Sequence, residues 1–179
     1  MSKEIIITLP DSSTLSANNG DTVYNIIGKI GKGLQQAAVA AEVNGEERDL
    51  AFVVNEDVRL KVFTFKETEG KDIFWHSASH LMAQAVKRLF PDAKLAIGPA
   101  IDSGFYYDFE IERPLNPEDL DSIEAEMEKL VEENLQVTRE EITKGEAIKI
   151  FSDMKEDYKV EMLQEMGGDS VSIYKQGIC

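Results

Sequence analysis

The chain has 179 residues, which is enough for one large domain or two small ones with a sizeable core. Its net charge is -15, and most of that excess lies in residues 66–179, where thirteen Lys and Arg stand against twenty-five Asp and Glu. Because an acidic surface repels phosphate, we expect no DNA binding and only local or partner-assisted contact with RNA.

The only cysteine is Cys179, so a disulfide within the chain is excluded, as is typical of a reducing compartment. The first residues, "MSKEIIITLP", contain too short an apolar run for a signal peptide, and no stretch approaches 18 consecutive apolar residues. We therefore expect a soluble cytoplasmic protein that has no membrane partner.

Residues 1–65 predict a small β-grasp domain, a mixed sheet of about four strands wrapped on one helix. A β-branched strand over Glu4–Leu9 precedes a helix that we expect Asp21 to cap. Asn44-Gly45 predicts a hairpin turn, and apolar residues alternate with charged ones along a last strand over Asp57–Phe65. The polar stretch that follows, "KETEGKD", is typical of a linker.

Residues 66–179 predict a second, α+β domain with a mostly antiparallel sheet and flanking helices. A helix over Ile73–Phe90 ends before Pro91, and two strands follow around a Gly98-Pro99 break and a Ser103-Gly104 turn. Asn116 then caps a second helix, whose apolar positions follow the helical period. Further on, the sequence predicts a strand in "VTREEIT", two short helices and a final strand in "VSIYKQ".

His76 and His80 are the only histidines, and at about 100° per residue they lie on one face of the first of these helices. We expect that face to point away from an apolar stripe formed by Phe74, Ala78, Leu81, Met82, Ala85 and Leu89. The small or polar neighbours Ser79, Ala83, Gln84 and Lys87 are expected to leave room for a ligand.

Three interpretations of the histidine pair stay open at this point. In the first, the two side chains are solvated surface groups, and in the second they are half of a metal site. In the third they are an acid–base or substrate-binding pair, since imidazole titrates near neutral pH. A complete zinc site needs at least three protein ligands, and the chain has no third histidine. His76 and His80 are thus at most a partial metal site.

The stretch "AIGPAIDSGFYYDFE" is the more unusual one. Its glycines let the backbone approach a bound group, and Tyr106 and Tyr107 should point to opposite faces of a sheet. One tyrosine can then face a pocket while the other packs. Taken alone, the stretch favours a hairpin with an aromatic core.

Together, "HSASHLMAQAVKRLFPDAKLAIGPAIDSGFYYDFE", "EDLDSIEAEMEKLVEENLQVTREEIT" and "YKVEML" resemble the amino-terminal editing domain of bacterial threonyl-tRNA synthetases. The segments "ITLPDSSTLS", "AAVAAEVNGEERDL" and "EDVRLKVFT" resemble the TGS domain that precedes it in those enzymes. The resemblance covers essentially the whole chain in the right order.

The resemblance implies hydrolysis of seryl-tRNA mischarged on the threonine tRNA. By motif, His76 and Lys159 match residues that handle water and protons, and His80, Tyr107 and Gly98 match residues that bind the substrate. It also implies the acceptor end of the threonine tRNA and the remainder of the synthetase as partners. No cofactor is expected in this chain, since ATP and zinc belong to the aminoacylation core.

The chain departs from the family pattern at its end. The family continues past "YxQG" into an acidic residue and a Cys-x-x-x-His pair, whereas this sequence stops at "YKQGIC". Cys179 is either that cysteine after a shortened loop or a residue outside the pattern.

We therefore expect an amino-terminal fragment, or alternatively a truncated paralogue, that cannot aminoacylate tRNA and edits weakly or not at all. A non-catalytic TGS-containing module that binds tRNA or regulates is the alternative function, and a free-standing deacylase is a further one.

Overall fold

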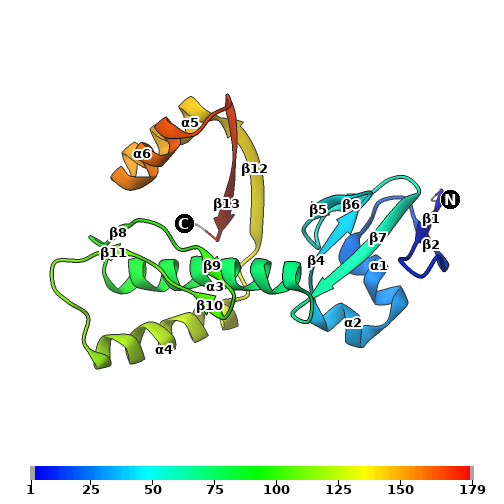
Figure 1. Cartoon of the computed structure of the whole chain (residues 1–179), viewed down its shortest axis with the longest axis horizontal. Helices are drawn as coiled ribbons and strands as arrows, with labels where there is room; N and C mark the ends of the chain where they lie inside the picture. Colours follow the sequence, from blue (N-terminus) through cyan, green and yellow to red (C-terminus); the bar gives the residue numbers. More distant parts are fainter. Residues whose placement is uncertain (1–2, 178–179) are drawn as a thin grey trace. The chain divides into compact units, whose positions relative to one another are not determined.

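The structure is a computed structural model that describes residues 3–177, so Cys179 lies outside the described residues. Within the described part, no helix is long and apolar enough to cross a membrane. The chain divides into two compact units, with the division between Trp75 and His76 (Figure 1). Each unit is described by itself.

The first unit is built on a five-stranded mixed sheet. The central strand β7 pairs in parallel with β1 and antiparallel with β4, which gives the order β2-β1-β7-β4-β5. The predicted mixed sheet is confirmed, as is the hairpin at Asn44-Gly45, which joins β4 to β5. The strands are β1 (Glu4–Thr8), β2 (Thr14–Asn18), β4 (Ala38–Val43), β5 (Glu46–Arg48) and β7 (Val58–Thr64), with β3 (Asp21–Thr22) and β6 (Val53–Val54) forming a separate pair.

Helix α1 (Val23–Ile30) buries Val23, Ile26 and Ile27 against this sheet. Its N-cap is Thr22, whose side chain accepts a hydrogen bond from the Asn25 amide, so the prediction of Asp21 was wrong. The Asp21 carboxylate instead accepts from the Asn18 amide and from Lys29, both of which hold its pKa below the usual range. A short second helix, α2 (Lys32–Ala37), was not predicted.

The stretch "KETEGKD" is not a linker, because helix α3 (Thr68–Leu89) begins within it. The Glu67 carboxylate accepts hydrogen bonds from the amide and the hydroxyl of Thr64, each at 2.8 Å, and these bonds lower its pKa. Gly70 is buried, and a methyl group on it would overlap the Thr64 carbonyl oxygen. A polar composition resembles a linker, but here the polar groups fasten the start of a helix.

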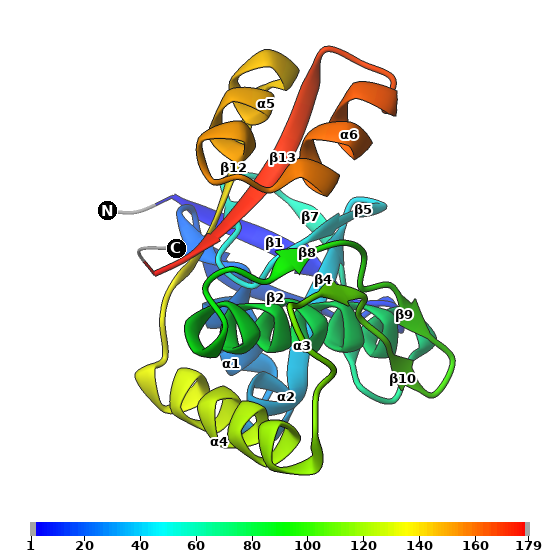
Figure 2. The same ribbon diagram turned by 90° about the vertical axis from the view of Figure 1, so that its left-hand side faces the viewer.

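In the second unit, α4 (Pro117–Glu133) packs along α3 (Figure 2). The shared core contains Ala85 and Val86 from α3 and Ile123 and Leu130 from α4. Arg88 of α3 also forms ion pairs with Glu126 and Glu133 of α4. Asn116 caps α4 through a capping box with Asp119, as the sequence predicted for the cap. Two positions of the predicted apolar stripe of α4, Leu120 and Val131, are exposed.

The segment from Lys94 to Glu110 folds back on itself as an irregular hairpin. The expected pair of strands is broken into two short ladders, since Pro99 has no N–H to donate. The turn lies at Asp102-Ser103, one residue before the predicted position. The strands are β8 (Lys94–Leu95), β9 (Ala100–Ile101), β10 (Gly104–Phe105) and β11 (Phe109–Glu110), pairing β8 with β11 and β9 with β10.

The rest of the second unit is a long two-stranded antiparallel ribbon that carries a pair of helices between its strands (Figure 1). All three ladders of this unit are antiparallel, so the predicted α+β class is confirmed. The elements are β12 (Val137–Thr143), α5 (Lys144–Asp153), α6 (Asp157–Glu165) and β13 (Ser170–Gln176).

We predict that Gly70→Ala lowers the stability of the first unit by about 1–2 kcal/mol. The overlap with a fixed backbone carbonyl outweighs the roughly 1 kcal/mol that alanine gains over glycine in a helix. Urea unfolding followed by the fluorescence of Trp75, the single tryptophan, measures the change.

Gly33→Ala is the matched control, because Gly33 also lies in a helix but has open space around it. It should raise stability by about 0.5–1 kcal/mol. Equal effects of the two substitutions would contradict the close packing of Gly70 on Thr64.

Candidate functional site

The buried face of α3 differs from the apolar stripe that the sequence predicted. Phe74 and Leu89, which were expected in the core, are 42% and 38% exposed, whereas Ser79 is fully buried. The Ser79 hydroxyl lies 2.8 Å from the His76 carbonyl oxygen and 2.9 Å from the Gly98 carbonyl oxygen. The room that small residues leave beside the histidines is therefore filled at Ser79 by the backbone of the hairpin, which corrects the expectation of a ligand there.

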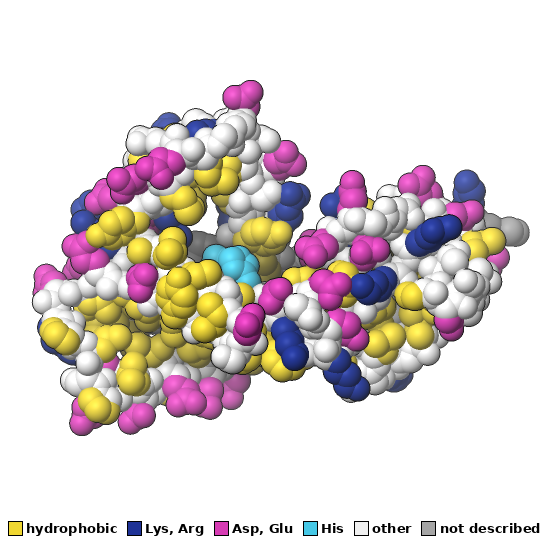
Figure 3. Space-filling view, viewed as in Figure 1, with side chains coloured by type: hydrophobic (Ala, Val, Ile, Leu, Met, Phe, Trp, Pro, Cys, Tyr) yellow, Lys and Arg dark blue, Asp and Glu magenta, His cyan; other side chains and the backbone are white. Residues whose placement is uncertain are grey.

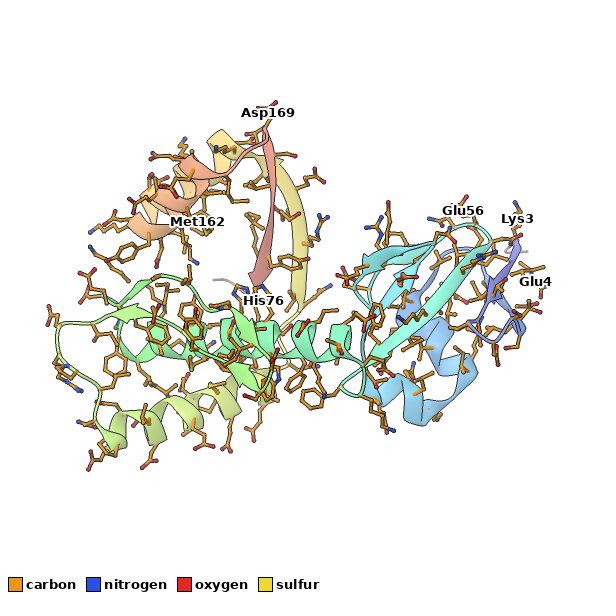
Figure 4. The ribbon with its side chains drawn as sticks, in the orientation of Figure 1. Lys3, Glu4, Glu56, His76, Met162 and Asp169 are labelled. Atoms are coloured by element: carbon orange, nitrogen blue, oxygen red, sulfur yellow. The ribbon has the colours of Figure 1, made fainter. Side chains whose placement is uncertain are left out.

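His76 and His80 are in direct contact on the exposed side of α3 (Figures 3 and 4). Their Nε2 atoms are 3.0 Å apart, and the ring planes are perpendicular with centroids 4.5 Å apart. Because a hydrogen bond needs one donor and one acceptor, only one of the two facing nitrogens carries a proton. The pair is thus a coupled unit that shares one proton between its facing atoms, not two independent surface groups.

The pKa of His80 is lowered to about 4. Desolvation by the surrounding protein is the largest cause, and repulsion from His76 and Lys159 adds to it. His80 is exposed as a residue, while its Nε2 atom faces His76. His80 is neutral at pH 7 and serves as a hydrogen-bonding group more readily than as a cation.

Lys159 comes from the first turn of α6 and is half-buried. Desolvation lowers the pKa of its ammonium group, and the neighbouring carboxylate of Glu156 acts in the opposite direction. The fold therefore brings Lys159 from a distant part of the sequence into electrostatic range of His80. A lysine with a lowered pKa exchanges protons more readily near neutral pH than an ordinary one.

Tyr107 is half-buried and stacks on Phe109, with ring centroids 4.7 Å apart, while Tyr106 is exposed. The Tyr107 ring lies directly against Gly98, where any side chain would overlap it. The missing side chain of Gly98 thus serves internal packing, and its carbonyl oxygen meets Ser79. Desolvation and the charge of Glu156 raise the pKa of the Tyr107 hydroxyl, which stays protonated and can donate a hydrogen bond.

Two further polar groups lie near this cluster: Glu156, which was not singled out from the sequence, and Gln84, which was expected beside room for a ligand. Glu156 is 2% exposed and forms an ion pair with Lys87, and no periodicity or motif of the sequence marked it as buried. The amide atoms of Gln84, one turn beyond His80 on α3, are buried without a hydrogen-bond partner among the described residues. No set of three or more His, Cys, Asp or Glu residues within 3–177 is placed to hold a metal ion.

Residues 5–64 match the TGS domain family. The first unit contains a TGS domain. Over 97% of its length the chain is 46% identical to a threonine–tRNA ligase of a Geobacter species and 47% identical to that of Acetivibrio thermocellus. A threonine–tRNA ligase of Clostridium tetani is 48% identical over the same share. These matches confirm the resemblance to the amino-terminal region of bacterial threonyl-tRNA synthetases.

The chain spans 27% of the length of these relatives. The TGS match ends at residue 64, next to the predicted domain boundary at 65, while the compact unit that contains it extends through the start of α3 to Trp75. The histidines and Lys159 all lie after the TGS domain.

We predict that His80 titrates far below the usual range for histidine, near pH 4, because of its desolvation and the charges beside it. Since the unfolded state takes up this proton near pH 6.5, the contribution of His80 to stability falls as the pH drops from 6.5 toward 4. NMR titration of the imidazole carbons measures the pKa directly.

Lys159→Ala should raise the pKa of His80, because it removes a repelling charge. Lys149→Ala, at an exposed position of α5, is the control and should leave it unchanged. An ordinary pKa near 6.5 for His80 in the unmodified chain would show that the pair is not desolvated.

Proposed function

We propose that the second unit is an editing domain that hydrolyses seryl-tRNA mischarged on the threonine tRNA. The observation that carries the proposal is the contact between His76 and His80, together with the charge of Lys159 on α6, which lowers the pKa of His80. The similarity of the chain to threonine–tRNA ligases supports a role in translation. An enzyme that activates threonine also needs such a step, because serine lacks only one methyl group.

The reaction is the attack of water on an aminoacyl ester. A bond forms between the water oxygen and the carbonyl carbon, the bond to the ribose oxygen breaks, and a proton passes from the water to the leaving oxygen. In this proposal His76 takes the proton from water, and Lys159 supplies positive charge to the developing oxyanion. The contact with neutral His80 orients the His76 ring for that transfer.

Substrate positioning falls to His80, Tyr107 and the backbone at Gly98. A neutral imidazole and a protonated phenol both offer hydrogen bonds to a ribose hydroxyl or to the amino acid without adding charge. Discrimination by a pocket that fits threonine is worth only about 1–3 kcal/mol per methylene, so a second site that excludes the larger product raises fidelity.

The proposed partners are the acceptor end of the threonine tRNA and the remainder of a longer synthetase, working in the cytoplasm. The net charge of -15 opposes strong binding to tRNA by this chain alone. We propose that water and the chain's own side chains carry the hydrolysis, and that ATP and zinc serve aminoacylation elsewhere in such a synthetase.

A second candidate function rests on the TGS domain. The match over residues 5–64 also fits a module that contacts tRNA or regulates without catalysis. In that case the histidine contact would be structural. Substitution of His76 would then change only tRNA binding and stability.

We predict slow hydrolysis of seryl-tRNA by the chain at high protein concentration, above the spontaneous rate of the ester. His76→Ala and Lys159→Ala should each return the rate to the spontaneous one, since general acid–base groups contribute on the order of 10²-fold or more. Release of labelled serine from the tRNA measures the rate.

Threonyl-tRNA is the matched substrate and should be spared, and Lys149→Ala is the matched variant and should keep full activity. Hydrolysis by Lys159→Ala at the unmodified rate would rule out the lysine. If the unmodified chain does not exceed the spontaneous rate, the non-catalytic function is favoured.

A further inference from the structure

Glu156 is a buried carboxylate that the proposed reaction does not use. Only 2% of its surface is exposed, and charged side chains are seldom so buried unless they are paired. Its Oε1 lies 2.9 Å from the Lys87 ammonium, and its Oε2 accepts a hydrogen bond of 3.4 Å from the Leu95 amide. Lys87 also donates to the Ala93 carbonyl oxygen at 2.9 Å.

These contacts join three elements that are far apart in the sequence. Lys87 belongs to α3, Leu95 to β8, and Glu156 is the N-cap of α6. The backbone of Glu156 also opens α6, since its carbonyl oxygen accepts from the amides of Lys159 at 3.0 Å and Val160 at 3.1 Å. Where the Glu156 side chain is fixed, the start of the helix that carries Lys159 is fixed as well.

We propose that Glu156 is a positioning residue of the deacylation site: its buried carboxylate, held by Lys87 and Leu95, places Lys159 beside the histidine pair. This inference rests on the proposed function, because it assigns Lys159 a part in the reaction. Glu156 itself does not contact the substrate, and it acts through Lys159.

The charge of Glu156 has a second consequence for the site. Desolvation lowers the pKa of Lys159, and the carboxylate counteracts this, so the lysine retains more of its charge. The same carboxylate raises the pKa of Tyr107. The other titratable groups of the neighbouring elements include His76, His80 and Lys87 on α3, Lys94 on β8, which pairs with Asp157 of α6, and Glu110 on β11, which accepts from Tyr158 of α6. Lys159 lies 5.8 Å from the Phe151 ring centroid on α5, a neighbour that carries no charge.

The ion pair can be broken by a substitution of either partner. Glu156→Gln keeps the size of the side chain and an oxygen for the Leu95 amide but removes the negative charge. Lys87→Met removes the cation that holds the carboxylate. The pKa of Lys159 should fall in Glu156→Gln, because the Glu156 carboxylate is the charge that raises it. Deacylation should fall in both variants, because each breaks the ion pair at the start of α6.

The test is an NMR titration of the Lys159 side chain in the unmodified chain, both variants and the control Glu165→Gln, an exposed position on α6. We expect a lower pKa of Lys159 in Glu156→Gln, no change of this pKa in the control, and slower deacylation of seryl-tRNA by Lys87→Met. Deacylation of seryl-tRNA should fall on the order of tenfold in Glu156→Gln, with the alkaline limb of its pH profile moved to lower pH.

A lower melting temperature in Glu156→Gln with an unchanged pKa of Lys159 and an unchanged pH profile would overturn the inference and leave Glu156 a stabilising residue only. If the unmodified chain does not deacylate, the proposed function fails, and the titration still decides whether Glu156 controls Lys159. Should Lys87→Met not fold, Glu156→Gln and its control give the same decision.

Discussion

The ion pair between the buried Glu156 carboxylate and the partly exposed Lys87 ammonium is the contact on which the proposed position of Lys159 depends. Burial of a carboxylate is costly, and it is tolerated here because Glu156 also accepts from the Leu95 amide, while Lys87 donates in addition to the Ala93 carbonyl oxygen. Loss of the Lys87 charge would leave the carboxylate unpaired in the protein interior. The ion pair therefore fixes the position of the start of α6 against α3 more specifically than a purely apolar contact would.

The histidine pair illustrates how one environment separates the roles of two identical side chains. His76 and His80 face each other at 3.0 Å, and the desolvation of His80 removes its ability to carry charge at neutral pH. A nearby lysine strengthens that effect by repulsion. In the proposed reaction the neutral His80 orients its partner, and His76 takes the proton from water.

Local sequence signals predicted much of the fold, since they act over a few residues. Asn116 capped α4, and Asn44-Gly45 formed a hairpin as expected. The polar residues after Phe65 were mistaken for a linker because their composition outweighed a local signal, the Thr64-x-x-Glu67 pattern that is typical of a helix start. Signals that depend on distant contacts failed for another reason. Ser79 was expected beside open space because its partner Gly98 lies far along the chain, and nothing near Ser79 in the sequence indicates it.

The sequence by itself determined the α+β class and the placement of His76 and His80 on one helix face, because helical spacing and turn chemistry are properties of short segments. Its resemblance to a known family identified the TGS domain. The tertiary structure decided which residues surround that pair. Lys159 and Glu156 lie about eighty residues away along the chain. The buried Glu156 carboxylate reaches α3 through its ion pair with Lys87, and Lys159 lies in the first turn of the helix that Glu156 caps. The environment that lowers the pKa of His80 is a product of that packing, and no single stretch of the chain contains it.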